Sequence, residues 1–279
     1  MNIKNTVHRC FRKLTQITKP NIRLCFLHIP KSGGTSLDFA IRKPLFSFEG
    51  QVFTPAMIEE TKKMVGDNFS ITHPLLWSNH QLIYLQYLAL DFPIVSGHFP
   101  FSKEAYDRDE SRYHYLTILR DPVERWISNY RYIKLKNKHY AQEYYPIHDE
   151  SLTLQQQLDS CINGDLGFFF ANIQCAFIGG YNFSGNVDMS EVVKKAKENL
   201  KAFKIVGFQN KLNEFALKFE DEFGYKISID RLNRTSEGIE SALEDQQVKE
   251  LFSENIRKKI RSLCVYDYEL YETAQELFR

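Results

Sequence analysis

A short segment near the N-terminus combines a lysine, glycines and hydroxyl side chains in an order suited to binding an anion. Its residues are Lys31, Ser32, Gly33, Gly34, Thr35 and Ser36. Backbone N–H groups and the dipole at a helix N-terminus attract negative charge, and the lysine adds a full positive charge. Glycines let the backbone approach the anion closely. The segment predicts a phosphate-like ligand, although strand–glycine–helix turns also occur in proteins without one.

The order of these residues differs from that of a Walker A loop, Gly-x-x-x-x-Gly-Lys-Ser/Thr. In that loop the lysine follows the glycines and a hydroxyl holds Mg²⁺, whereas here Lys31 precedes Gly33 and Gly34. A nucleotide phosphate remains possible, but a magnesium-dependent kinase site is disfavoured. The 5 cysteines are scattered, with no Cys-x-x-Cys pair, so neither a zinc site nor a disulfide framework is expected.

Two more candidates for chemistry follow apolar runs that are typical of strands. His98 comes after residues 94–95, and Arg120 comes after residues 115–119. Ligands of open parallel sheets lie beyond the carboxyl ends of the strands. A histidine there, with an unperturbed pKa of about 6.5, suits a general base, or it bonds a backbone carbonyl. Arg120 precedes a helix N-terminus, so its partner is an acidic side chain or a phosphate, and Ser128 lies two turns into that helix.

The elements that must position these residues alternate between strands and helices along the chain. Strands are expected at 24–29, 94–95, 115–119 and 204–208. Helices are expected at 35–42, 54–66 and 81–90, from 122, at 151–162, 188–203 and 211–223, and in two pieces over 244–278. Pro44 is expected to end the first of these helices. Residues 46–53, 67–81 and 134–150 are expected to be loops, the last a lid or acceptor-binding loop. This alternation predicts one α/β domain over 23–279 with a mainly parallel sheet, after a polar lead-in over 1–22.

Composition and charge exclude several classes of function. The chain has 279 residues, of which 43% are hydrophobic, and a formal net charge of +1. Such a balance gives no indication of nucleic-acid or membrane-surface binding. No run approaches the roughly 20 apolar residues of a membrane span, and the basic N-terminus lacks an apolar signal core. We therefore expect a soluble, cytoplasmic protein, and the sequence leaves its oligomeric state open.

The same segments resemble the motifs of sulfotransferases that use 3′-phosphoadenosine 5′-phosphosulfate (PAPS). Residues 28–37 resemble the 5′-phosphosulfate loop, in the form found in heparan sulfate 2-O-sulfotransferases and their bacterial relatives. Residues 119–130 resemble the 3′-phosphate motif, in which an Arg and a Ser lie eight residues apart. Residues 96–100 resemble the segment that supplies a catalytic His. The match keeps its order and spacing from residue 24 to about 271.

This resemblance implies a P-loop NTPase-like three-layer α/β sandwich with a central parallel sheet. It implies PAPS as donor, adenosine 3′,5′-bisphosphate as product and no metal. Lys31 would stabilise the leaving oxygen, and Ser32, Gly33, Gly34, Thr35 and Ser36 would hold the 5′ end. Arg120 and Ser128, with Arg234 as a further candidate, would hold the 3′-phosphate. His98 would be the general base, and Asn172 and Gln174 are candidates for orienting donor or acceptor.

The resemblance implies in-line transfer of a sulfuryl group to an acceptor hydroxyl. Because the net charge is only +1 and no dense basic run flanks the site, a long acidic glycan is disfavoured as acceptor. A carbohydrate or glycolipid hydroxyl is the first expectation, and a smaller, aromatic-lined acceptor is the second. Two other readings are a P-loop nucleotide kinase and a non-catalytic nucleotide-binding domain of the same fold.

Overall fold

The structure is a computed structural model that describes residues 22–52, 74–136, 149, 151–164, 167, 171–181, 188–229 and 246–279. Several sequence-based predictions lie outside these residues: the lead-in over 1–21, the helix over 54–66, most of the loop over 134–150, and Arg234.

A five-stranded sheet, with every neighbouring pair parallel, forms the centre of the described part of the chain. Its strands, in spatial order, are β2 (Gln51–Val52), β3 (Ile94–Gly97), β1 (Leu24–Leu27), β4 (His114–Leu119) and β5 (Phe203–Phe208). Strands β2 and β3 lie on one side of β1, and strands β4 and β5, which come later in the sequence, lie on the other side. Such a switch point leaves a crevice at the carboxyl ends of the central strands. The predicted α/β class with a central parallel sheet is confirmed.

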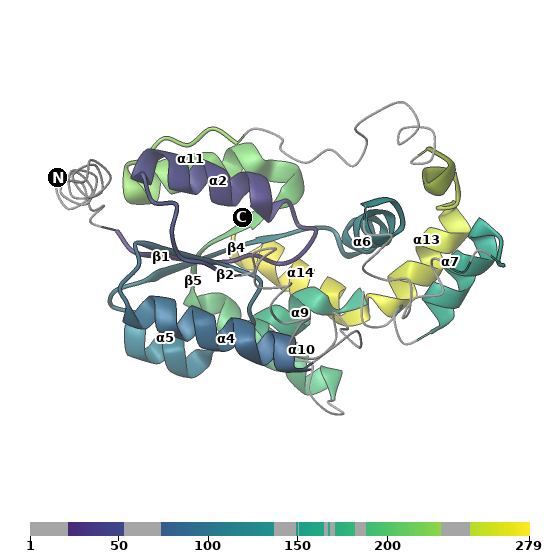
Figure 1. Cartoon of the computed structure of the whole chain (residues 1–279), viewed down its shortest axis with the longest axis horizontal. Helices are drawn as coiled ribbons and strands as arrows, with labels where there is room; N and C mark the ends of the chain where they lie inside the picture. The colour runs from purple at the N-terminus through teal and green to yellow at the C-terminus, as the bar shows by residue number, and fades with distance from the viewer. Residues whose placement is uncertain are drawn as a thin grey trace, which may run out of the picture.

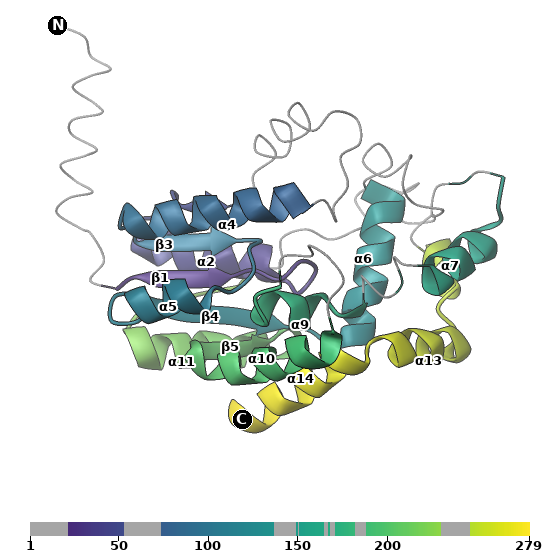
Figure 2. The same ribbon diagram turned by 90° about the horizontal axis from the view of Figure 1, so that it is seen from below.

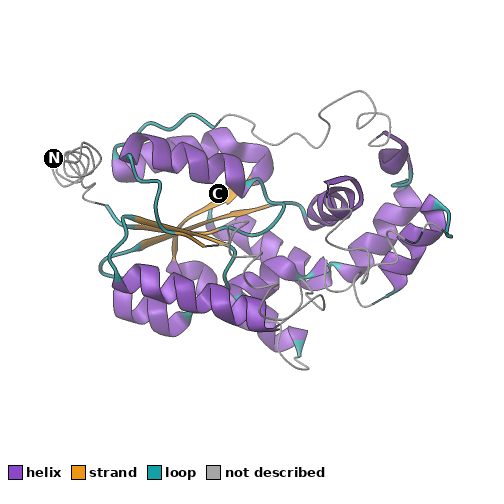
Figure 3. Cartoon of the chain, viewed as in Figure 1, coloured by secondary structure: helices purple, strands orange, loops and turns teal. Residues whose placement is uncertain are grey.

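Helices cover both faces of the sheet, as Figures 1 and 3 show. On one face lie α2 (Gly34–Leu45) and α11 (Leu212–Phe223). On the other lie α4 (Pro74–Ala89), α5 (Lys103–Asp109), α9 (Ile173–Ile178), α10 (Met189–Asn199) and α14 (Val265–Leu277). The side chains of β1 alternate between the two cores: Leu24 and Phe26 pack with α2 and α11, and Cys25 and Leu27 pack toward the other layer. The result is the predicted three-layer sandwich.

A separate helical group stands beyond the carboxyl end of the sheet (Figure 2). It contains α6 (Pro122–Lys136), α7 (Leu154–Asn163) and α13 (Glu254–Leu263), which share a hydrophobic cluster. Trp126 and Tyr130 are fully buried in it, and the indole N–H of Trp126 donates to the carbonyl of Gly167 at 3.1 Å. This cluster fixes the position of α6, the helix that carries Ser128.

Two predicted boundaries were wrong for local reasons. Helix α2 runs through Pro44 to Leu45, because a proline this close to the C-terminus removes one bond of the last turn. The following Phe46 is in the left-handed conformation, and its N–H caps the helix. Residues 74–81, expected to be a loop, open α4, since Pro74 suits a first helical position.

Other elements differ from the sequence-based expectation in extent. The segment expected to be an aromatic loop contains the short edge strand β2, and α5 was not predicted. Helix α5 starts after Ser102, whose Oγ accepts from the N–H of Ala105 at 3.2 Å. The predicted break in the last helical stretch is confirmed, because α13 and α14 meet at Cys264.

Candidate active site

The loop between β1 and α2 has the backbone needed to approach an anion. Lys31 and Gly33 have positive φ angles of 66° and 88°, and Gly33 precedes the first residue of α2. There is no room for a side chain at the next position, because a Cβ atom on Gly34 would lie 2.0 Å from Cδ2 of His28. Helix α2 begins directly after this turn, and the N-terminus of a helix presents backbone N–H groups and partial positive charge to an anion.

Lys31 stands in a positively charged neighbourhood. Its Nζ lies 3.7 Å from the centroid of the Tyr132 ring, a cation–π contact with helix α6. Burial, together with repulsion from Arg120 and Arg131, lowers the pKa of Lys31 to about 8. A bound anion would reverse this shift, since an opposite charge favours the ammonium form.

Arg120 links the two segments that the sequence marked as phosphate motifs. It follows β4 directly, and its Nη1 donates to the carbonyl oxygen of Lys31 at 3.1 Å, across 89 residues of sequence. Burial lowers the pKa of Arg120, but a guanidinium remains charged at neutral pH. The structure thus brings Lys31 and Arg120 together as expected.

Two further residues, Ser128 and Arg234, are expected to bind the 3′-phosphate, and Arg234 lies outside the described residues. Ser128 is half-buried on α6, eight residues after Arg120. Asp121 caps this helix, because its Oδ1 accepts from the N–H of Glu124 at 3.0 Å. The Glu124 side chain pairs with Arg257 of α13 at 2.5 Å. The 3′-phosphate roles of Arg120, Ser128 and Arg234 stay predictions.

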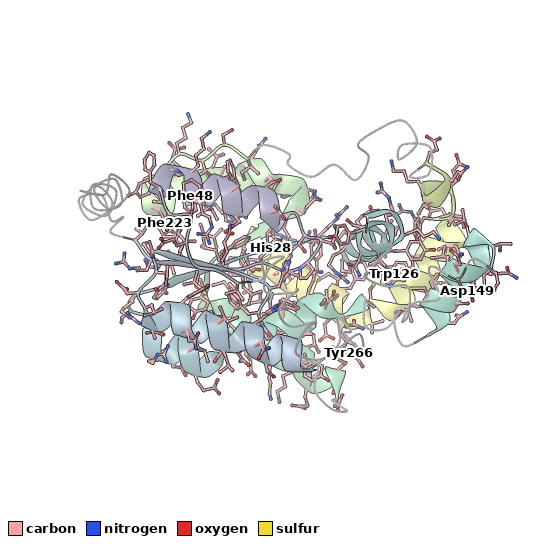
Figure 4. All side chains as sticks on the ribbon, viewed as in Figure 1. His28, Phe48, Trp126, Asp149, Phe223 and Tyr266 are labelled. Carbon is pink, nitrogen blue, oxygen red and sulfur yellow. The ribbon has the colours of Figure 1, made fainter. Side chains whose placement is uncertain are left out.

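His98 emerges at the carboxyl end of β3 beside the anion-binding loop. Its Nδ1 lies 2.5 Å from the carbonyl oxygen of His28, and the two rings are 4.4 Å apart between centroids. Figure 4 shows His28 at the end of the sheet that faces α6. Because a carbonyl can only accept, Nδ1 carries the proton in this bond and Nε2 keeps its lone pair. His98 as a whole residue is half-buried, and a neutral ring with a lone pair on Nε2 has the form that a general base requires.

The electrostatic environment keeps His98 neutral. Its pKa is lowered to about 4, mainly by burial and also by the charge of Lys31, while the bond to the carbonyl of His28 acts in the opposite direction. The pKa of His28 is also lowered, mainly by burial. The unperturbed value near 6.5 assumed from sequence therefore does not apply to the protein without ligand, and negative charge nearby would raise the pKa of His98 again.

Arg131 and Tyr132 were not among the predicted site residues, and Gln174 was predicted only as a candidate for orienting donor or acceptor. Arg131 and Tyr132 follow Ser128 by three and four positions, so the helical period of α6 could have identified them. Gln174 contacts the backbone of Arg120 through its side-chain amide. No local pattern links residues 54 positions apart, so sequence alone gave no signal for this contact.

Neither a metal site nor a membrane span is found in the described part of the chain. No three His, Cys, Asp or Glu side chains gather there as a metal ion would require. Among the described helices, none combines the length and the apolar character needed to cross a membrane. A reaction without metal stays a prediction.

A central parallel sheet with a switch point, helices on both faces and a glycine turn that joins the central strand to a helix define an α/β protein of the three-layer class. The sulfotransferase family matches this chain over residues 15–273, and the chain belongs to that family.

Several heparan-sulfate sulfotransferases are similar to it. Human heparan-sulfate 6-O-sulfotransferase 2 is 24% identical over 96% of this chain and 46% of its own length. The zebrafish (Danio rerio) protein of the same name is 25% identical over 91% of this chain and 58% of its own length. Zebrafish heparan-sulfate 6-O-sulfotransferase 3-B is 24% identical over 96% of this chain and 67% of its own length. The chain spans about half the length of the first of these relatives. Because all three are 6-O enzymes by name, the likeness to the 2-O branch stays a prediction.

Proposed function

We propose that this chain transfers the sulfuryl group of PAPS to a carbohydrate hydroxyl. The observation that carries the proposal is the 3.1 Å hydrogen bond from Arg120 Nη1 to the carbonyl of Lys31. It joins the loop that resembles a 5′-phosphosulfate site to the arginine expected to hold a 3′-phosphate. A nucleotide with phosphates at both positions can therefore contact the two segments at once.

The polar groups at this junction fit an anionic donor. Ser32 Oγ and Arg120 Nε are buried and make no hydrogen bond within the described residues. Buried polar groups in native proteins are normally satisfied, so these two atoms favour a ligand that supplies acceptor oxygens. Lys31, Arg120 and Arg131 concentrate positive charge in the same place, as their mutual effects on pKa indicate.

The donor supplies an activated sulfuryl group, and the residues of this chain position it and stabilise charge. His98 Nε2 accepts the proton of the acceptor hydroxyl as the hydroxyl oxygen bonds to sulfur. Lys31 stabilises the negative charge that appears on the phosphate oxygen when its bond to sulfur breaks. The negative charge of the donor raises the pKa of His98 above about 4 and so makes it a stronger base in the complex.

The acceptor that we propose first is an acidic glycan of the heparan-sulfate type. The support comes from the names of the relatives and from the local positive charge at Lys31, Arg120 and Arg131, which the net charge of +1 conceals. We further propose a cytoplasmic location, because Cys25, Cys161, Cys175 and Cys264 are free and buried, as is common in reducing compartments. Cell fractionation tests this location.

The test of function is transfer of ³⁵S from labelled PAPS to heparan sulfate, a neutral oligosaccharide and a glycolipid in parallel. We expect the highest incorporation into heparan sulfate, and label in a neutral acceptor alone would overturn the acidic-acceptor proposal. No incorporation into any acceptor, or transfer of the γ-phosphate of Mg·ATP instead, would refute the sulfotransferase assignment.

A pair of histidine variants tests the mechanism in the same assay. His98→Ala should bind adenosine 3′,5′-bisphosphate normally and transfer roughly 10²–10⁴-fold more slowly. His114→Ala is the matched control, because His114 is exposed on β4 and its ring packs against Phe223, away from the loop. A native rate for His98→Ala would exclude His98 as the base.

A further inference from the structure

Gln174 holds the main chain of Arg120 with both ends of its side-chain amide. The N–H of Arg120 donates to Oε1 at 3.0 Å, and Nε2 donates to the carbonyl oxygen of Arg120, also at 3.0 Å. The Gln174 side chain is fully buried on α9. Because one end must accept and the other must donate, the two bonds leave the amide a single orientation.

The hydrogen bonds between Gln174 and Arg120 lie directly beyond the end of strand β4. The ladder between β4 and β5 ends at the pair Leu119–Phe208, and the ladder between β1 and β4 ends at Leu27–Thr117. Arg120 is the next residue of the chain, and its backbone groups meet the amide of Gln174 where a strand partner would otherwise stand. The direction in which Arg120 leaves β4 therefore depends on Gln174.

Gln174 is itself fixed from the last helix. Asp267, on the first turn of α14, accepts from the backbone N–H of Gln174 at 3.3 Å and from that of Cys175 at 2.8 Å. The Asp267 carboxylate is fully buried and lies 3.8 Å from Nε of Arg125, which is also fully buried. A connected set of contacts thus runs from Asp267 through Gln174 to Arg120 and on to the carbonyl of Lys31.

We propose that Gln174 is a positioning residue that sets the preference of the site for a nucleotide carrying a 3′-phosphate. It does so without touching the nucleotide, by holding the backbone from which the Arg120 side chain extends. The proposal rests on the proposed function, in which Arg120 binds the 3′-phosphate. A ligand without that phosphate should not depend on Gln174.

The experiment compares calorimetric binding of adenosine 3′,5′-bisphosphate and of AMP to the native chain and to Gln174→Met. Methionine has a similar volume and packs in a core, but it lacks the amide. Two hydrogen bonds are lost, so the affinity for the bisphosphate should fall about tenfold or more. The affinity for AMP should stay within about twofold, because AMP lacks the 3′-phosphate that Arg120 is proposed to bind. If Gln174→Met does not fold, Gln174→Glu, which keeps the acceptor for the N–H of Arg120, is measured in its place.

Asn199 provides the matched control. Its side-chain amide also holds α9, but its Nδ2 donates to the carbonyl of Ile178 at 2.8 Å rather than to Arg120. Asn172, whose Nδ2 donates to the carbonyl of Leu263 at 3.1 Å, is not used because it is itself a predicted site residue. Asn199→Leu should lower the thermal stability and leave the ratio of the two affinities unchanged. An equal drop in this ratio for both variants would mean that general loosening, not Gln174, controls the preference.

A double variant separates action through Arg120 from direct action. On the Arg120→Ala background, Gln174→Met should cause no further loss of bisphosphate affinity, whereas a full loss there would overturn the proposal. The proposal would also be overturned if Gln174→Met alone left the ratio of the bisphosphate and AMP affinities unchanged. Failure of the proposed function gives a different result: the native chain itself would then bind AMP as tightly as the bisphosphate.

Discussion

Gly34 lets us test how tightly the anion-binding loop and the proposed base are coupled. In Gly34→Ala the new Cβ would lie 2.0 Å from Cδ2 of His28, about 1.4 Å inside the start of ordinary contact at 3.4 Å. The His28 ring is flanked by the rings of Phe26 and His98, at 5.7 Å and 4.4 Å between centroids. The ring must therefore move, and its movement disturbs the residue whose carbonyl holds Nδ1 of His98.

The expected effects on stability and on rate differ in size. Overpacking typically costs about 1–3 kcal/mol, and alanine in a helix gains about 1 kcal/mol over glycine. The free energy of unfolding of Gly34→Ala should fall by about 0–2 kcal/mol. Displacing a catalytic group by about 1 Å can lower the rate about 10²-fold, so kcat should fall far more than stability. Urea unfolding and ³⁵S transfer at saturating donor measure the two quantities.

Gly224→Ala is the control for backbone strain alone. Gly224 ends α11 with a φ of 73°, and no atom lies within 4 Å of the position of an added Cβ. This variant should lose about 1 kcal/mol of stability and keep the native kcat. If Gly34→Ala also kept the native kcat, the coupling between the loop and His98 would be refuted.

The clash itself can be isolated by removing the ring that it meets. His28→Ala keeps the backbone carbonyl that accepts from His98 Nδ1 but removes the imidazole. On this background Gly34→Ala should be nearly harmless, and the double variant should be more active than the sum of the single effects predicts. Additive losses would mean that Gly34 acts by another route, such as the path of the backbone around the anion.

Three further predictions concern titration. The pKa of Lys31 is lowered to about 8, so affinity for adenosine 3′,5′-bisphosphate should fall as the pH rises through and above 8. Calorimetry should show no such fall for Lys31→Ala. The control Lys103→Ala, at an exposed lysine, should show the same fall as the native chain. His98, with its pKa lowered to about 4, should titrate near pH 4 by NMR without ligand and at higher pH with the bisphosphate bound; a value near 6.5 without ligand would contradict the burial. The pKa of Asp267 is raised from 3.8 to about 6, so the folded state binds more protons than the unfolded state between these values, and stability should decrease by about 3 kcal/mol as the pH rises through this window. Asp267→Asn should remove that slope from the urea midpoints, and a native slope in the variant would assign it to another group.

The parts of the site that could be predicted from sequence are the motifs formed by consecutive residues. The loop at Lys31 and the turn at Arg120 each join a buried strand to a helix, and glycine, proline and capping residues mark such junctions locally. Parallel strands with crossover helices then bring both junctions to one edge of the sheet. The closeness of the two junctions follows from this topology, whereas the hydrogen bond to the carbonyl of Lys31 depends on the guanidinium of Arg120.

The state of His98 could not be predicted in the same way. Its position after β3 was evident, but its pKa depends on how much protein surrounds the ring and on the carbonyl of His28, 70 residues earlier. Helix limits failed for a related reason. Pro44 and Pro74 are read from sequence as breaks, yet one is tolerated in a last turn and the other begins a helix.

The C-terminal helix α14 shows why the two phosphate motifs are not sufficient for the site. Leu270, Tyr271 and Ala274 of α14 pack into the core beneath the sheet, while Asp267 on the same helix accepts the backbone N–H groups that fix Gln174. A buried carboxylate costs free energy unless it is hydrogen-bonded and paired, so Asp267 is stable only where α9 and Arg125 surround it. The contacts of α14 therefore help to fix Gln174, whose amide holds the backbone of Arg120. The position of the residues that resemble a 3′-phosphate motif thus depends in part on a helix far away in the sequence.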